Sequence, residues 1–274
     1  MDCRLNYAIK AALLSKIETH IKTDQPFSLL RLGDGESYAW DNVTSAQNTN
    51  EVLKMREYMW WNTCLEPYHR AQIQQDMYEA ISKANMLGIP SLYRFTRDAS
   101  TSLISYEGHR STSGLLRVLK GVSELPDFPA PSSREFTEDR IHHICFNFEG
   151  ITKLARHAKK NLIISSLKPA IISQLFAPYI GNTPLITVSI STHTKTQKND
   201  LFVSDDEPIP FIYKKVAKQI AKVCDPGTLG LVAGGAIGKI FCETIRAHGG
   251  VALDVGSMAD YWVGAKTRSV ADLI

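Results

Sequence analysis

Paired cysteines, long apolar runs and a dominant sign of charge are all missing from this sequence of 274 residues. No C-x-x-C pair occurs, so neither a disulfide framework nor a zinc site is expected, and reduced, mostly buried thiols are favoured. No stretch approaches the roughly 18 consecutive apolar residues of a membrane-spanning helix. We therefore expect no membrane insertion. The five cysteines lie far apart, at Cys3, Cys64, Cys145, Cys224 and Cys242.

The charge balance is nearly even, with 31 basic and 28 acidic residues and a formal net charge of +3. Because no strong field of one sign results, a nucleic-acid partner is not expected. The opening segment MDCRLNYAIKAALLSKIETHIK carries charges throughout, which is typical of neither a signal peptide nor an anchor. We expect a soluble, cytoplasmic protein whose slight positive balance allows peripheral association with a membrane. The sequence does not indicate an oligomeric state.

Hydrophobic patterning indicates alternating strands and helices, in a chain with the apolar share of an average globular protein. Such alternation predicts an α/β, Rossmann-like fold, with a mostly parallel sheet and helices on both faces. The predicted strands are 27–32, 86–95, 141–148, 161–166, 184–191, 228–234 and 251–257. The predicted helices are 5–21, 50–87 with Pro67 opening a second helix, 112–119, 149–160, 168–180, 211–224 and 236–249.

The length suggests one large domain or two small ones. A proline-rich stretch near 122–137 forms either a surface loop or a domain joint.

The first candidate site is the segment Arg31-Leu-Gly-Asp-Gly-Glu36, which follows a predicted strand. Two carboxylates separated by one glycine, Asp34 and Glu36, converge on a hard cation when they lie in a turn at the carboxyl end of a strand. Gly33 and Gly35 let the backbone approach a ligand, and Arg31 meets a phosphate or orients a carboxylate. The alternative is an ordinary turn with a solvated glutamate.

A second candidate is the glycine loop Gly234-Gly235-Ala-Ile-Gly238-Lys239, between a predicted strand and a predicted helix. Backbone amides at a helix N-terminus can bind a phosphate, and Asp254 follows at the end of the next strand, as in a dinucleotide fingerprint. The pattern G-G-x-x-G differs from G-x-G-x-x-G, so tight strand-to-helix packing is the competing interpretation.

Further polar residues follow other strands. Arg94 is a candidate to bind a diphosphate, and Asp98, His193 and Asp260 are candidate proton acceptors among which the sequence does not choose. His142 and His143 alternate on a predicted strand, so at most one of them faces any site. The absence of G-x-S-x-G argues against a serine hydrolase of the α/β type.

The two ends of the chain together resemble one known family. The stretch FSLLRLGDGE is similar to the R-x-G-D-G-E element of the GT-D class of glycosyltransferases. The ending GLVAGGAIGKIFCETIRAHGGVALDVGSMADYWVG is similar to the closing strand, glycine loop, helix and strand of that class. The resemblance implies a metal-dependent transferase on a Rossmann-like fold, with Asp34 and Glu36 as its metal- and nucleotide-binding element. It also implies one catalytic domain over residues 1–274, in which the ends of the first and last strands converge.

This resemblance implies a specific chemistry. The donor would be a nucleotide-diphosphate sugar, with uridine diphosphate expected, and the acceptor a glycan, glycoprotein or lipid-linked glycan. The cofactor would be a divalent cation, with Mn²⁺ expected and Mg²⁺ as the alternative. Two other hypotheses remain open: an enzyme that binds a dinucleotide or S-adenosylmethionine at residues 234–239, and a non-catalytic nucleotide-sugar-binding module.

Overall fold

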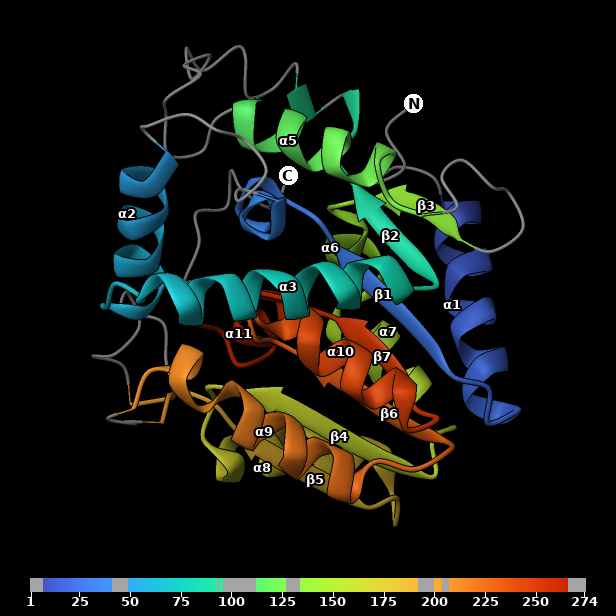
Figure 1. The fold of residues 1–274 in the computed structure, drawn as a ribbon. Helices are drawn as coiled ribbons and strands as arrows, with labels where there is room; N and C mark the ends of the chain where they lie inside the picture. The colour runs from blue at the N-terminus through green and yellow to red at the C-terminus, as the bar shows by residue number, and fades with distance from the viewer. Residues whose placement is uncertain are drawn as a thin grey trace.

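The computed structural model describes residues 7–40, 49–92, 94–95, 112–126, 134–191, 200–203 and 207–265. Seven strands in this part of the chain form one parallel sheet, in the order β3-β2-β1-β7-β6-β4-β5 (Figure 1). The strands are β1 (Phe27–Arg31), β2 (Met86–Ile89), β3 (Glu135–Glu138), β4 (Lys160–Ser165), β5 (Leu185–Ser189), β6 (Thr228–Val232) and β7 (Val251–Asp254). The α/β, Rossmann-like fold predicted from the sequence is therefore confirmed.

Helices cover both faces of the sheet and bury two apolar clusters against it (Figure 1). One face packs against α2 (Thr49–Trp61), α3 (Pro67–Lys83), α5 (Thr112–Ser123), α9 (Ile209–Val223) and α10 (Gly238–Ala247). The other packs against α1 (Tyr7–Lys22), α6 (Ile141–Cys145), α7 (Phe148–Ala155), α8 (Pro169–Ile180) and α11 (Met258–Trp262). Strand residues buried on both sides explain the nearly continuous apolar runs of β4, β6 and β7.

The first and last strands are neighbours, as expected from the sequence. β1 pairs with β7 through Ser28↔Ala252 and Leu29↔Leu253, and with β2 through Arg31↔Gly88. From β1 the chain proceeds outward through β2 to β3 on one side of the sheet. The other four strands all lie on the opposite side of β1, with β7 next to it, so the direction of strand order changes between β1 and β7. Ligands of open parallel sheets bind at the carboxyl edge where such a reversal occurs.

The strand predicted over residues 141–148 is wrong, because α6 occupies residues 141–145 and α7 begins at residue 148. Ile141 and Cys145 are both buried and four residues apart, which suits one helical face as well as a short apolar strand. Asn147 then caps α7 by accepting a hydrogen bond from the Gly150 amide at 2.9 Å. This side-chain cap starts a new helix where the apolar letters alone suggested a continuous strand.

Strand β3 was not predicted. It has only four residues, Glu135–Glu138, and it lies at the edge of the sheet, where Glu135 and Phe136 are exposed and Glu138 is buried. The segment expected near 122–137 to be a loop or joint therefore includes the end of α5 and most of β3, while residues 127–133 lie outside the described part. Because β3 pairs with β2, this segment returns to the same sheet.

Two sequence-based expectations about cysteine and membranes concern the described residues as well. Cys64, Cys145, Cys224 and Cys242 are free thiols, and all but Cys64 are buried. Burial raises the pKa of Cys145 to about 12 and that of Cys224 to about 11. None of the helices in the described ranges has the length and apolar character that a bilayer crossing requires.

Candidate active site

The R-x-G-D-G-E segment forms a tight turn at the carboxyl edge of β1. After Arg31 the chain turns at Gly33 and enters the 3-10 helix η2 (Asp34–Trp40). One carboxylate oxygen of Glu36 accepts a hydrogen bond from the Gly33 amide at 2.8 Å, and both acidic side chains lie in the first turn of η2. Acidic side chains are stabilised at that end of a helix because its amides are otherwise unpaired.

Two glycines of α5 allow this helix to pack closely against η2 and hold it in place. A Cβ on Gly114 would lie 2.9 Å from the Asp34 carbonyl oxygen, and one on Gly121 would overlap the Trp40 indole. The two glycines are seven residues apart, which places them on the same side of the helix. Their spacing is the sequence signal that could have identified this close contact with the turn.

A buried hydrogen-bond network fixes the far end of η2. Tyr38 donates to a Glu57 oxygen at 2.6 Å, and Arg70 donates to the other Glu57 oxygen at 2.9 Å. Burial, followed by the contact with Glu57, raises the pKa of Tyr38, so its hydroxyl stays a donor. The network joins η2 to α2 and α3 and restrains the turn that carries Asp34 and Glu36.

Four charged side chains from both ends of the chain form what we term the closed cluster: Arg31, Glu36, Lys239 and Asp254. The Lys239 ammonium nitrogen lies 2.7 Å from Glu36 Oε1 and 2.7 Å from Asp254 Oδ2, and its side chain is 1% exposed. Arg31 donates from Nε to the Asp254 carbonyl at 2.9 Å and contacts its carboxylate at 3.2 Å.

The electrostatics of the closed cluster favour its charged forms. Burial alone would raise the pKa of Asp254, but Arg31 and Lys239 outweigh it and lower that pKa. Burial alone would lower the pKa of Lys239, but Asp254 and Glu36 outweigh it and raise that pKa. The cluster therefore contains two cations and two carboxylates that neutralise one another.

Gly256 makes room for Arg31 in this arrangement. Its φ of +52° lies in the left-handed region, and a Cβ there would overlap the Arg31 guanidinium. Arg31 Nη1 also lies 2.8 Å from Nε2 of His142, whose ring is 3.9 Å from that of His143. The sequence did not connect His142 to Arg31, because the pair depends on α6 being a helix.

Three further charged residues form what we term the open cluster: Asp34, Arg94 and Asp139. Arg94 Nη2 lies 3.4 Å from Asp34 Oδ1, and Arg94 Nη1 pairs with Asp139 Oδ2. The Asp34 side chain is 25% exposed, whereas that of Asp139 is 3% exposed. Among the described residues, the second Asp139 oxygen, Oδ1, has no hydrogen-bond partner.

Asp139 is the main site residue that sequence reasoning missed. It directly follows β3, and burial raises its pKa to about 6 despite the opposing charges of Arg94, Arg140 and Arg31. A Cβ on Gly33 would lie 3.4 Å from Glu36 Oε2 and 3.9 Å from Asp139 Oδ2, so both carboxylates border the same turn. The run Glu138-Asp139-Arg140, all buried, is the sequence signal that could have drawn attention to this edge.

The glycine loop between β6 and α10 is closely packed. A Cβ on Gly234 would lie 2.9 Å from the Gly238 Cα, so these two glycines bring strand and helix together. Gly235 has a φ of +56° and faces open space. Lys239 points from this loop into the closed cluster, toward carboxylates and away from solvent.

Of the three predicted proton acceptors, the structure describes Asp260. Asp260 lies in α11, half-buried and six residues after Asp254. Asp98 and His193 lie outside the described residues.

Asp34 and Glu36 are not equally suited to bind a divalent cation. Both Glu36 oxygens have protein partners, the Lys239 ammonium and the Gly33 amide. Asp34 is more accessible and has a longer contact to Arg94, so it is the better ligand of the predicted pair. Within the described ranges, no group of three or more histidine, cysteine, aspartate or glutamate side chains is arranged to hold a metal by itself.

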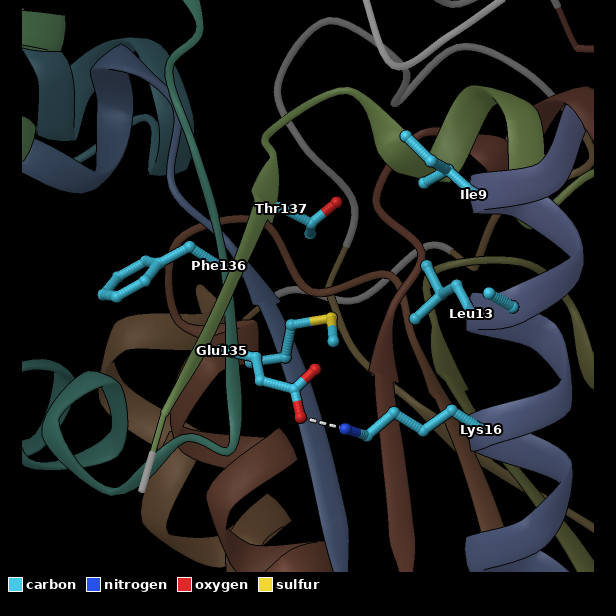
Figure 2. A pocket seen from close by; sticks show the side chains of 8 residues that line it. Ile9, Leu13, Lys16, Glu135, Phe136 and Thr137 are labelled. Atoms are coloured by element: carbon cyan, nitrogen blue, oxygen red, sulfur yellow. Dashed lines mark hydrogen bonds and ion pairs between the residues drawn. The ribbon is translucent and has the colours of Figure 1, made fainter. Parts of the chain in front are cut away.

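A separate pocket lies between α1 and the start of β2 and β3 (Figure 2). It has a volume of about 230 Å³ and mainly apolar walls. Figure 2 shows Lys16 of α1 reaching across it to Glu135, while Phe136 points away. Because it opens near the amino ends of these strands, it is distinct from the two charged clusters.

A parallel α/β sheet with charged side chains gathered at its carboxyl edge defines a Rossmann-like protein with a candidate ligand site at that edge. Residues 9–110 match the GT-D-like family model, described as a GT-D fold-like domain. This match includes β1, the Asp34-Gly-Glu36 turn, β2 and Arg94. The resemblance to the GT-D class is thereby confirmed over residues 9–110, which form a GT-D-like segment. No curated protein and no solved structure matches the chain.

Proposed function

We propose that this protein is a cation-dependent glycosyltransferase. It transfers a sugar from a nucleotide-diphosphate donor, with uridine diphosphate as the expected nucleotide, to a hydroxyl of a glycan, glycoprotein or lipid-linked acceptor. The cation is Mn²⁺ or Mg²⁺, and the protein acts in the cytoplasm, with peripheral membrane association where its acceptor is lipid-linked.

One observation carries this proposal: the Asp34-Gly-Glu36 turn lies at the carboxyl edge of β1, beside the strand-order reversal, within the GT-D-like segment. The turn is held by α5 and by the Tyr38 network, so its acidic side chains are positioned before any ligand binds. Preorganised groups at a sheet edge favour ligand binding because little conformational entropy is lost on association.

We assign different roles to the two clusters on the basis of their charges. The closed cluster has no net formal charge, so Arg31 and Lys239 contribute mainly by fixing Glu36 and the end of β7. Arg94 borders the more exposed Asp34, and we assign its guanidinium to binding of the donor diphosphate. Asp34 would hold the divalent cation, which would neutralise the diphosphate and make it a better leaving group.

In the proposed reaction, an acceptor hydroxyl attacks the anomeric carbon of the sugar. The bond from that carbon to the diphosphate breaks, and the diphosphate leaves with the electron pair. The hydroxyl proton passes to a side chain of the protein, for which Asp98, His193 and Asp260 remain the candidates. Arg94 compensates the charge that develops on the diphosphate oxygen.

The glycine loop does not favour the dinucleotide or S-adenosylmethionine hypothesis. Gly234 and Gly238 are required by the close approach of β6 and α10, and Lys239 is enclosed by carboxylates. These contacts explain the motif by packing, without a bound cofactor.

The test is thermal unfolding with uridine diphosphate, with and without Mn²⁺, followed by a donor-consumption assay. A nucleotide at about 100 times its Kd stabilises the native state by about 2.7 kcal/mol, which raises Tm by several degrees. We expect this increase to require Mn²⁺ and to disappear in Asp34→Ala. Glu149→Gln, a change of an exposed carboxylate in α7, is the matched control and should behave like the wild type.

Several results would overturn the proposal. Full donor turnover by Asp34→Ala would show that this turn is not the site. Stabilisation by a dinucleotide or S-adenosylmethionine without Mn²⁺ would favour the alternative enzyme. Binding of the nucleotide sugar with no donor consumed, in the presence of varied acceptors, would indicate a non-catalytic binding module.

A further inference from the structure

The Arg94 guanidinium bridges two carboxylates that come from separate strand ends. Asp34 follows β1 and Asp139 follows β3, with β2 between them in the sheet. One guanidinium contacts both, through Nη2 and Nη1 respectively. Two carboxylates that contact the same guanidinium border the same space, so a different cation that takes the place of the guanidinium can draw both toward itself.

Asp139 also has an oxygen without a hydrogen-bond partner in the described part of the chain. Its side chain is 3% exposed, and Oδ1 accepts no hydrogen bond from the described residues. Leaving a buried polar atom unpaired is destabilising, so such an atom calls for an explanation. Asp139 Oδ2 lies 3.9 Å from the place of a Cβ on Gly33, so this carboxylate borders the turn that bears Asp34.

Glu36 differs from Asp139 in this respect. Its Oε1 pairs with Lys239 at 2.7 Å, and its Oε2 accepts from the Gly33 amide at 2.8 Å. A cation at Glu36 would have to displace one of these contacts or lie near a buried ammonium, which repels it.

We propose that Asp139, and not Glu36, is the second protein ligand of the cation that Asp34 binds, and that Glu36 is a positioning residue for the turn. This inference rests on the proposed function, because it concerns the cation of that reaction. Carboxylate oxygens are the ligands that Mg²⁺ and Mn²⁺ prefer, and donor phosphate oxygens complete such sites. Arg94 neutralises the carboxylates while the cation is absent and is displaced from them when it binds.

The experiment titrates the full chain with Mn²⁺ alone, without nucleotide, and follows free Mn²⁺ by electron paramagnetic resonance. The wild type should bind saturably, and Asp34→Asn and Asp139→Asn should each raise the Kd at least about tenfold, since even changing a group that only supports a ligand costs about 10–100-fold in affinity. Glu36→Gln keeps one acceptor oxygen and loses one of the two contacts of this side chain. Because Glu36 is not a ligand in this proposal, the variant should raise the Kd at most about threefold. Circular dichroism and urea unfolding establish that each variant is folded.

Arg94→Gln provides a second test with the opposite sign. Removing the guanidinium takes away the group that competes with the cation, so we expect the Kd for Mn²⁺ to fall about threefold or more. If Asp139→Asn does not fold, this variant decides the question. An unchanged or weaker affinity in Arg94→Gln, no saturable binding by the wild type, or a larger loss in Glu36→Gln than in Asp139→Asn would each overturn the inference.

These outcomes are distinguishable from failure of the proposed function. Mn²⁺ binding that depends on Asp139, without any effect of uridine diphosphate, supports the inference and counts against the transferase. Nucleotide and Mn²⁺ binding that is unaffected by Asp139→Asn supports the transferase and overturns the inference.

Discussion

The closed and open clusters use the same kinds of side chain in different ways. In the closed cluster, Lys239 and Asp254 are each 1% exposed and tightly paired. In the open cluster, Asp34 is 25% exposed and an Asp139 oxygen has no partner among the described residues. The closed cluster is fully paired and has a structural role, whereas the open cluster has an exposed carboxylate and an unpaired oxygen that can bind a ligand.

The pairing within the closed cluster explains why the motifs at the two ends of the chain occur together. The arginine of R-x-G-D-G-E pairs with the aspartate of the closing L-D-x-G, and the glycine of that motif gives the guanidinium its space. The pairing ties β1 to β7 at the sheet edge. A buried, fully paired cluster fixes one arrangement because breaking any pair leaves an uncompensated charge.

The largest effect is expected from Lys239→Met. Removing this ammonium leaves Glu36 and Asp254 with one fewer counter-ion, and breaking a buried ion pair in this way costs about 3–5 kcal/mol. Urea unfolding measures the free energy of unfolding. Arg94→Gln is the matched change in the open cluster and should lower it by less than half as much. Equal losses would contradict the distinction between the clusters.

A smaller effect is expected from Gly256→Ala. The added Cβ overlaps the Arg31 guanidinium and also sits at a left-handed φ of +52°. Gly264→Ala is the control, because Gly264 has a φ of +73° but nothing within 4 Å of its Cβ position. Both variants carry the backbone strain of about 1–2 kcal/mol, and only Gly256→Ala adds the clash. A difference of at least about 1 kcal/mol is expected in urea unfolding, and equal stability would show that Arg31 relocates freely.

Sequence patterning predicted much of the fold and half of the site. β1, the following turn and the alternation from β4 to β7 were predictable because short apolar runs are bounded there by glycine and polar residues. The convergence of Asp254 with the first strand followed from the parallel topology. The prediction that Asp34 and Glu36 are the cation ligands has not been tested.

The open cluster was less predictable because it depends on β3. That strand is short, polar and at the sheet edge, so it has no periodic apolar signal. Without β3, Asp139 could not be placed beside the Asp34 turn. The strand predicted over 141–148 was wrong for a related reason, because the Asn147 cap that starts α7 within this segment leaves no mark on the apolar spacing.

The smallest effect, and the one that compares the clusters most directly, is the pH dependence of stability. Burial raises the pKa of Asp139 to about 6, above its value near 3.8 in the unfolded chain. The folded state therefore binds more protons between these values, and Asp139 favours unfolding as the pH rises. Arg94, Arg140, Arg31 and Glu138 are the charged neighbours that shape this titration.

Relative to Asp139→Asn, the wild type should gain about 1 kcal/mol of stability as the pH falls from 7 to 5, since one pKa unit corresponds to about 1.4 kcal/mol. Urea unfolding of both proteins at pH 5, 6 and 7 measures this difference, in which other titrating groups cancel. Asp254 has the opposite sign, because its lowered pKa stabilises the fold above the unfolded value and this stabilisation is lost only below about pH 4. Parallel profiles for the wild type and Asp139→Asn would mean that Asp139 is better solvated or paired than the open cluster implies.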